Sequence, residues 1–347
     1  KLVRTDCRAP EAVVAWLGAV QAQDYPGARW ALGLRTKGIT DAEVERACDE
    51  GRILRTHILR PTWHFVSPAD IRWMLSVSGP RVNAVNAHYY RKKGLDAAVF
   101  ARSRRAIERA LAGGRHLTRL ELASVLDKAG IQAAGQRLAY LMMRAELDGV
   151  ICSGARRGRQ STYALLDARA PATPTMTREE ALAALATRYF TSHGPATLRD
   201  YVWWSGLTVR DARTGIGAAG KALQTITIHG RVHWLAASGA RASKSGPSLY
   251  LLPNYDEYLI AYKDRGGLRD SSLPASSPVS IEFPHFLVID GKLRGTWKRT
   301  ARAGRAVIEL RSFGPLSPDE RRRLDAEATR FGKFAGMPAA VEAHRSQ

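Results

Sequence analysis

Two glutamines and an aspartate lie close together near the start of the chain, in the sequence Gln21-Ala22-Gln23-Asp24. The apolar spacing of residues 10–20 predicts a helix that begins at Pro10, and Pro26-Gly27 should end it. We therefore expect both glutamines at or just beyond the end of a helix. Residues two apart on extended backbone share a face, so the two amides can converge on one point. Such amides can hold a water molecule by hydrogen bonds, although glutamine is no base at pH 7.

Other roles for this segment stay open at this point. A polar run at the end of a helix also occurs as a cap or as solvated surface. Asp24 either supplies negative charge beside the glutamines or caps the next turn of the chain.

Motifs for metals and nucleotides are weak. His57 and His64 flank a turn, but no third ligand is spaced with them, so hydrogen-bonding or core roles are expected. Residues 215–220 match the pattern GxGxxG, yet a helix pattern precedes them and a strand pattern follows, which is the reverse of the order that dinucleotide binding needs. We therefore expect no metal site and no cofactor.

The charge balance indicates an anionic partner. The chain has 347 residues, with 53 Lys and Arg against 32 Asp and Glu, and a formal net charge of +21. Arginines occur in every segment, which favours a folded basic surface for nucleic acid, and no apolar run is long enough to span a membrane. Cys7, Cys48 and Cys152 are far apart, which favours a reducing compartment, and we expect a cytoplasmic protein.

Helices followed by a two-stranded ribbon, the order of a winged helix, recur three times along the chain. The sequence therefore predicts an α+β fold with three tandem winged helix-turn-helix units at residues 1–110, 111–170 and 176–240. The expected ribbons pair the strands 53–59 and 62–66, 150–152 and 161–166, and 223–229 and 232–236. A helix is expected at 69–77 and a linker rich in Pro, Ala and Thr at 168–175. Thr118 with Glu121 forms a capping-box signature.

The last part of the chain, residues 245–347, has a different pattern. Asp290-Gly291 between two apolar runs predicts a β-hairpin, a further strand follows at 305–312, and a closing helix is expected at 318–332. Residues 271–280 are rich in Ser and Pro and predict a mobile loop.

Two basic clusters are candidates for contact with DNA. The tip of the second ribbon carries Arg156, Arg157 and Arg159, which suit phosphate or minor-groove contact, although a solvated loop tip is the alternative. The second cluster is expected at the turn between the last two strands and is formed by Lys298, Arg299, Arg302 and Arg305.

Three stretches together give the chain a family resemblance. These are Gln21-Ala22-Gln23, the sequence Leu-Arg-Pro-Thr-Trp-His-Phe-Val at 59–66, and Leu-Leu-Pro-Asn-Tyr-Asp-Glu at 251–257. The chain resembles the winged-helix DNA glycosylases of the AlkZ type, which confer resistance to the crosslinking agent azinomycin B. The resemblance covers nearly the whole chain. A related branch, typified by YcaQ, has Asp where this chain has Gln23, which favours the crosslink-unhooking branch.

The resemblance implies a C-shaped body of three winged helices with a basic concave face for duplex DNA, and it implies catalytic roles for Gln21 and Gln23. It also implies a monofunctional, metal-independent enzyme that excises N7-alkylated guanine and unhooks azinomycin-type crosslinks. A family hairpin that probes the minor groove is expected in residues 286–312. Alkylation at N7 leaves a cationic base that departs without a general acid, so the remaining tasks are to stabilise the sugar cation and place a water. Gln23 would orient this water, Gln21 would steady it or the sugar, and Asp24 is possible support.

A different class of protein also fits the basic surface and the ribbons, namely a non-catalytic winged-helix transcriptional regulator. Such a regulator needs a helix that reads base edges. The candidate recognition helices at 133–147 and 209–219 are poor in regularly spaced exposed Asn, Gln and Arg, which favours sequence-independent binding. We expect a monomer that binds double-stranded DNA carrying alkylated guanine.

Overall fold

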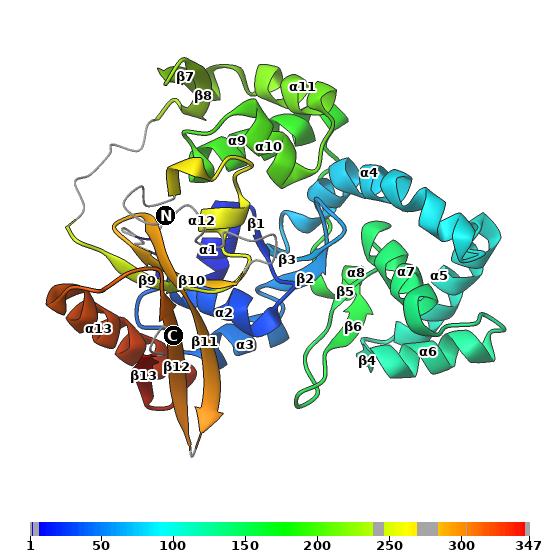
Figure 1. The fold of residues 1–347 in the computed structure, drawn as a ribbon. Helices are drawn as coiled ribbons and strands as arrows, with labels where there is room; N and C mark the ends of the chain where they lie inside the picture. The colour runs from blue at the N-terminus through cyan, green and yellow to red at the C-terminus, as the bar shows by residue number, and fades with distance from the viewer. Residues whose placement is uncertain (1, 3–6, 239–245, 269–283, 303, 344–347) are drawn as a thin grey trace. The chain divides into compact units, whose positions relative to one another are not determined.

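The computed structural model describes residues 2, 7–238, 246–268, 284–302 and 304–343, and within them the chain has an α+β fold (Figure 1). The backbone forms two compact units. The first comprises residues 1–13, 21–45 and 239–347, and the second comprises residues 14–20 and 46–238. The loop predicted at 271–280 lies outside the described residues. None of the helices in the described ranges is long and apolar enough to cross a membrane.

The first unit is built on a five-stranded sheet, counted over the described residues, with the order β13-β12-β11-β10-β9. Neighbouring strands are antiparallel except β12 and β13, which run parallel. Its elements are α2 (Tyr25–Gly33), β9 (Leu249–Leu252), α12 (Glu257–Ile260), the 3₁₀ turn η2 (Gly266–Leu268), β10 (His285–Ile289), β11 (Lys292–Arg302), β12 (Arg305–Ser312), α13 (Pro318–Ala335) and β13 (Ala339–Ala343).

Aromatic rings from α2, α13 and the sheet form the core of this unit. Trp30 of α2 packs edge-on against Phe331 of α13 with ring centroids 5.1 Å apart, and Phe331 also contacts Trp297 of β11. The indole N–H groups of Trp30 and Trp297 donate to the carbonyls of Leu251 and Leu252, at 2.7 and 2.9 Å. The two hydrogen bonds join α2 and β11 to strand β9 and give the buried indole N–H groups the partners that they need, while Phe331 packs α13 against both indole rings.

The Asp290-Gly291 hairpin is confirmed. Both residues have left-handed φ angles, 48° and 80°, and Ile289 pairs with Lys292 across the turn. This two-residue turn matches the right-handed twist of the flanking strands. β11 runs on to Arg302, so Lys298 and Arg299 lie within the strand and not at a turn, whereas Arg302 is the last residue of β11 and pairs with Arg305, the first residue of β12.

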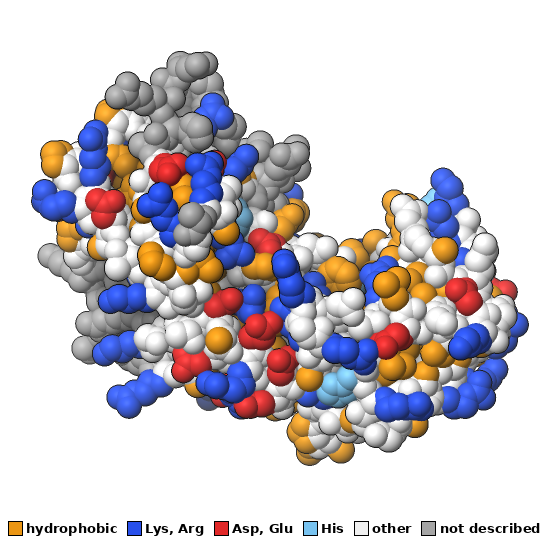
Figure 2. Space-filling view, turned by 90° about the horizontal axis from the view of Figure 1, so that it is seen from below, with side chains coloured by type: hydrophobic (Ala, Val, Ile, Leu, Met, Phe, Trp, Pro, Cys, Tyr) orange, Lys and Arg blue, Asp and Glu red, His pale blue; other side chains and the backbone are white. Residues whose placement is uncertain are grey.

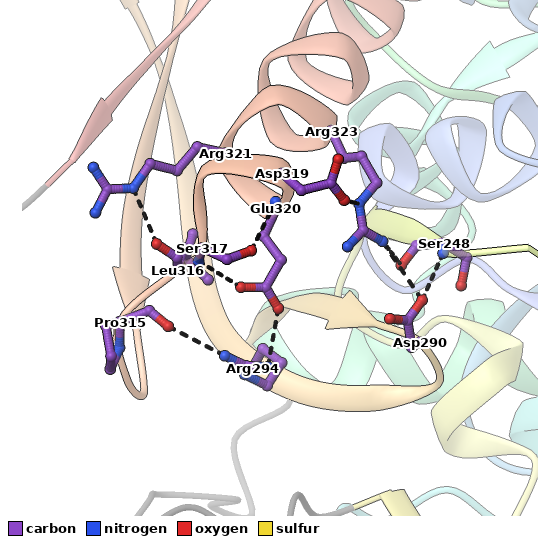
Figure 3. A network of polar contacts seen from close by, with 10 residues as sticks. All are labelled: Ser248, Asp290, Arg294, Pro315, Leu316, Ser317, Asp319, Glu320, Arg321 and Arg323. Atoms are coloured by element: carbon purple, nitrogen blue, oxygen red, sulfur yellow. Dashed lines mark hydrogen bonds and ion pairs between the residues drawn. The ribbon is translucent and has the colours of Figure 1, made fainter.

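A polar network fixes the start of α13 to the sheet (Figure 3). Ser317 and Glu320 form a capping box, and the second carboxylate oxygen of Glu320 accepts from Arg294 of β11 at 3.1 Å. One turn later, Arg323 reaches Asp290, whose carboxylate also accepts from the Ser248 backbone N–H at 2.6 Å. The closing helix is therefore tied at its first two turns to the hairpin and to the start of β9.

The second unit holds most of the helices. Its elements are β2 (Leu54–His57), β3 (Trp63–Val66), α4 (Ile71–Lys92), α5 (Ala97–Leu111), β4 (Leu117–Thr118), α6 (Arg119–Lys128), α7 (Gly135–Leu147), β5 (Ile151–Ser153), β6 (Thr162–Leu165), α8 (Leu166–Arg169), α9 (Arg178–His193), α10 (Leu198–Ser205), α11 (Val209–Ala219), the 3₁₀ turn η1 (Gly220–Ala222), β7 (Leu223–Ile228) and β8 (Arg231–Ala236). All three predicted ribbons are present as β2–β3, β5–β6 and β7–β8. The capping box at Thr118 and Glu121 is confirmed at the start of α6.

Three elements have residues in both units: α1 (Pro10–Leu17), β1 (Ala19–Gln21) and α3 (Asp41–Asp49). The helix predicted at 10–20 is wrong in its last turn. α1 ends before Gly18, whose φ of 85° is left-handed, and a strand follows. Pro26 does not end a helix either, because it lies in the first turn of α2, where its missing N–H costs nothing.

Two further expectations are corrected. The helix predicted at 69–77 continues to Lys92 through Pro80, and Gly79 gives it a close approach to α7: a Cβ there would lie 2.6 Å from the carbonyl oxygen of Leu147. The linker predicted at 168–175 begins inside α8, where Arg169 donates to the carbonyls of Cys48 and Asp49. In both places tertiary contacts override a local stop signal.

The carboxyl of Glu327 gives the first unit a testable pH dependence. Burial raises its pKa to about 7, against the opposing effects of Arg330 and the Leu251 backbone N–H. Because the folded pKa lies above the unfolded value of 4.5, wild-type stability falls as pH rises from 4.5 through 7. The variant Glu327→Gln lacks this titration. When the pH rises from 4 to 8, its unfolding free energy should therefore increase by about 1–3 kcal/mol relative to that of wild type.

Urea unfolding at both pH values measures this difference. Asp325→Asn, at an exposed carboxylate of the same helix, is the matched control and should show no such gain. If the difference in stability between Glu327→Gln and wild type is the same at both pH values, the assignment is contradicted.

Candidate functional site

The glutamine motif lies between a strand and a helix. Gln21 is the last residue of β1, and Asp24 occupies the N-cap position of α2. Gln21 is buried, with an exposed fraction of 7 %, whereas Gln23 is exposed. Both glutamines therefore lie on non-helical backbone, as expected, although the cause is a strand and not a broken helix.

A carboxylate from a distant part of the chain holds the first glutamine. The backbone N–H of Gln21 donates to Oε1 of Glu257 at 3.2 Å, across 236 residues of sequence. Glu257 is 1 % exposed and is the first residue of α12. The structure thus brings together the motif at 21–23 and the stretch at 251–257.

A buried ion pair stands beside this contact. The guanidinium of Arg35, just after α2, donates two hydrogen bonds of 2.7 and 2.8 Å to the two carboxylate oxygens of Asp256. Burial lowers the pKa of Arg35, but the Asp256 carboxylate outweighs burial, so the pKa lies above its ordinary value. Arg35 also donates to the Ala31 carbonyl at 2.9 Å. Asp256 in turn caps α12 by accepting from the Tyr258 N–H at 2.8 Å.

Gly27 makes room for two oxygen atoms next to the motif. A Cβ on Gly27 would lie 2.7 Å from Oδ2 of Asp24 and 2.9 Å from Oδ1 of Asn254. In the described part of the chain, Asp24 makes no side-chain capping bond, and the buried Oδ1 of Asn254 has no hydrogen-bond partner. Tyr255, the next residue, has a left-handed φ of 57°. The carboxylate of Asp24 is therefore not used as a helix cap, which leaves its charge beside the motif.

His285 supports the loop that carries Asn254. Its Nδ1 accepts the Asn254 backbone N–H at 3.2 Å, so the ring is bound in its neutral form. Burial lowers the pKa of His285; the charge of Asp24 opposes this effect, and that of Arg299 adds to it. The ring also packs on Trp297, with centroids 4.9 Å apart.

The arginines at the tip of the second ribbon differ in their contacts. Arg157 forms an ion pair with Glu121 at 2.7 Å and donates to the His116 carbonyl at 2.9 Å. The side chain of Arg156 donates to the Arg159 carbonyl, and its backbone N–H donates to Asp49 at 2.8 Å. Arg159 is exposed. Two of the three predicted arginines are thus engaged within the protein.

The basic residues of the last hairpin line strand β11. Lys298, Arg299 and Arg302 are exposed, and the Arg299 guanidinium lies 5.9 Å from the centre of the Phe331 ring. Arg302 forms ion pairs with Glu309 and Glu342, at 3.2 and 3.3 Å. Arg305, expected at the same turn, pairs with Arg302 across the two strands.

The histidines that suggested a metal have other partners. Nδ1 of His57 contacts the Glu146 carboxylate, and Nδ1 of His64 donates to the Thr62 carbonyl at 2.9 Å. Across the described ranges, His, Cys, Asp and Glu side chains form no group of three or more that could hold a metal ion.

Sequence reasoning assigned no role to Glu257, Asn254 or His285. The stretch at 251–257 enters only through the family resemblance, which gives Asp256 and Glu257 no role of their own. The structure starts a short helix at Glu257, with Asp256 as its cap. Asp256 precedes the short segment Glu-Tyr-Leu-Ile, and an Asp in this place is an available signal for the start of a helix, since Asp is a common N-cap.

Comparison with known proteins places this chain in a class, the DNA glycosylases. The sequence model described as DNA glycosylase AlkZ-like matches residues 14–334. The chain belongs to the AlkZ-like DNA glycosylase family. A curated relative from Streptomyces sahachiroi, named interstrand DNA cross-link repair glycosylase, is 26% identical over 308 residues, which are 82% of this chain and 81% of the relative.

A solved structure agrees with the fold. The Streptomyces sahachiroi DNA glycosylase AlkZ matches with a TM-score of 0.79 at 22% identity, covering 98% of this chain and 95% of that chain. Its family makes the chain a glycosylase, and the alternative of a non-catalytic regulator is not favoured.

Removing one partner of the buried ion pair should destabilise the protein. Asp256→Ala leaves the Arg35 charge buried and unpaired, and we expect a loss of about 3–5 kcal/mol in unfolding free energy. The double variant Arg35→Met, Asp256→Met removes both charges and should recover most of this loss. Urea unfolding measures both effects, and a single variant within about 1 kcal/mol of wild type would contradict this role.

Proposed function

We propose that this glycosylase excises N7-alkylated guanine from duplex DNA and unhooks azinomycin-type interstrand crosslinks. It acts as a monofunctional, metal-independent hydrolase and as a monomer. Family membership supports the glycosylase chemistry, and the name of the curated relative supports a crosslink as substrate. The observation that carries the proposal is the hydrogen bond from Gln21 to Glu257, because it joins two of the three stretches that carry the resemblance.

The chemistry follows from the charge of the lesion. Guanine alkylated at N7 is cationic, so it leaves with the electrons of the C1′–N9 bond without being protonated. The protein has to place a water and to stabilise positive charge on the sugar. Gln23 orients the water through its exposed amide, Gln21 steadies the water or the sugar, and Asp24 supplies negative charge nearby.

The exposure of Gln23 supports action on bulky lesions. Many enzymes that act on a base turn it out of the helix into a closed pocket. A crosslinked guanine is tied to the opposite strand and cannot enter such a pocket easily. A glutamine at the protein surface can reach a sugar in an open groove, which suits a substrate of this size.

We further propose that the chain is organised as three winged-helix units. The strand orders support this, because β1-β3-β2 and β4-β6-β5 place the strand before the helices next to the second strand of the ribbon. In the third segment Ala196 bridges to Trp234 of β8, which puts a residue in the equivalent place beside the β7–β8 ribbon. The ribbons then serve as wings, with Arg156, Arg157 and Arg159 at the tip of the second.

The surface charge supports binding to the DNA backbone. Figure 2 shows Lys and Arg side chains distributed over the face in view, interspersed with acidic and hydrophobic ones. With a formal net charge of +21, binding is expected to depend mainly on phosphates. The exposed basic residues of β11, Lys298, Arg299 and Arg302, would belong to the hairpin that contacts the minor groove.

Replacement of the motif glutamines tests the proposal. In a single-turnover assay on duplex DNA with one N7-methylguanine, Gln23→Ala should release base about 10²-fold more slowly or worse, since a group that orients the water is lost. Gln21→Ala should also be slow. Gln132→Ala, at an exposed glutamine of the second unit, is the control and should match wild type. The assignment is wrong if both motif variants keep the full rate.

The salt dependence of binding tests the second wing. A plot of log K against log salt concentration should have a slope smaller in magnitude by about 0.9 for Arg159→Ala, because one phosphate contact is lost. Arg104→Ala removes an exposed arginine that pairs with Glu108 in the same helix, and it should leave the slope unchanged. An unchanged slope for Arg159→Ala would remove this residue from the interface.

A further inference from the structure

We propose that Glu257 is a positioning residue for the glutamine motif: its buried carboxylate fixes the backbone at Gln21 and thereby sets where the amide of Gln21 lies. This inference rests on the proposed function of the glutamines. It adds a residue that does not touch the substrate and acts only through Gln21.

The hydrogen bond between Gln21 and Glu257 is shielded from water. The Gln21 N–H and the Glu257 Oε1 atom are 3.2 Å apart, and the two residues are 7 % and 1 % exposed. A carboxylate is a stronger acceptor for a backbone N–H than a neutral oxygen is. In a site with little access to water, the bond has no solvent competitor, so it holds Gln21 firmly.

The carboxylate itself is held on a fixed support. Glu257 begins α12, and the residue before it, Asp256, is clamped by the two hydrogen bonds from Arg35. On the other side, the hydroxyl of Tyr258 donates to the Gly291 carbonyl at 3.0 Å. The backbone of Glu257 is thus anchored both before and after the residue. Because the Glu257 carboxylate is anchored in this way, it fixes the position of the Gln21 backbone in addition to accepting its N–H.

The position of the Gln21 side chain matters because its amide acts on the water or the sugar through hydrogen bonds alone, and these depend on distance and angle. A misplacement of about 1 Å in a positioning group can cost about 10²-fold in rate. Gln21 is the last residue of β1, so the strand no longer fixes the chain beyond it. Glu257 supplies the restraint at the point where the strand ends and the motif continues.

Two substitutions distinguish this role from a general effect of charge. If Glu257 acts through its hydrogen bond, a neutral side chain of equal length preserves the role, whereas a shorter carboxylate does not reach. If its charge acted on the sugar cation directly, Glu257→Asp would keep more of the rate than Glu257→Gln. The comparison of Glu257→Gln with Glu257→Asp therefore decides between them.

The experiment is single-turnover release of N7-methylguanine from duplex DNA, with DNA affinity and urea unfolding measured for each variant. We expect Glu257→Ala and Glu257→Asp to lower the rate at least about tenfold with unchanged DNA affinity, and Glu257→Gln to stay within about threefold of wild type. Asp200→Ala is the matched control: Asp200 is a buried carboxylate that accepts the Thr197 backbone N–H at 3.0 Å, and its loss should not change the rate.

A double variant tests whether Glu257 acts through Gln21. In the Gln21→Ala background, Glu257→Ala should cause little additional loss, since there is no amide left to position. If the rate reductions of Gln21→Ala and Glu257→Ala multiply in the double variant, Glu257 acts independently of Gln21 and the inference is overturned. If Glu257→Ala does not fold, the same comparison is made with Glu257→Asp.

The remaining outcomes separate this inference from the function on which it rests. A wild-type rate for Glu257→Ala together with slow Gln21→Ala and Gln23→Ala would overturn the role of Glu257 and leave the proposed function intact. A higher rate for Glu257→Asp than for Glu257→Gln would also overturn it. Full activity of both glutamine variants would instead refute the proposed function.

Discussion

The buried ion pair between Arg35 and Asp256 is the interaction on which the candidate site depends. The two side chains are 1% and 0% exposed, so each charge faces its partner in place of water. Such a pair is stable only with both partners and good geometry, which the two short hydrogen bonds provide. Because Arg35 follows α2 and Asp256 caps the start of α12, the pair joins the helix that follows the glutamine motif to the helix that carries Glu257.

Carboxylates that accept backbone N–H groups recur throughout this protein. At the helix starts they form capping boxes, in which the acceptor lies three residues from the donor; these are Thr118 with Glu121, Thr177 with Glu180, Thr197 with Asp200, and Ser317 with Glu320. The contact from Gln21 to Glu257 uses the same chemistry, but its acceptor comes from 236 residues away. The local version organises single helices, and the distant version connects segments that the sequence separates.

This difference explains what could be predicted from the sequence. The three ribbons, the Asp290-Gly291 hairpin and the cap at Thr118 follow from neighbouring residues, and all are present. The end of α1 was missed because an apolar helical spacing continues to Val20, whereas the chain there joins a sheet with a distant ribbon. Glu257 and His285 were missed for the same reason: their partners are far away in sequence, and no spacing rule reports them.

Gly27 gives the site a constraint that is easily overlooked. A glycine is favoured at position 27 by lack of space and not by the backbone angle, since an added methyl group would press on both Asp24 and Asn254. A larger residue in place of Gly27 is therefore accommodated only if the side chain of Asp24 or Asn254 moves or is replaced. Over evolutionary time the three should vary as a set, so that relatives carrying a larger residue in place of Gly27 would also carry a smaller or differently shaped side chain at one of the other two.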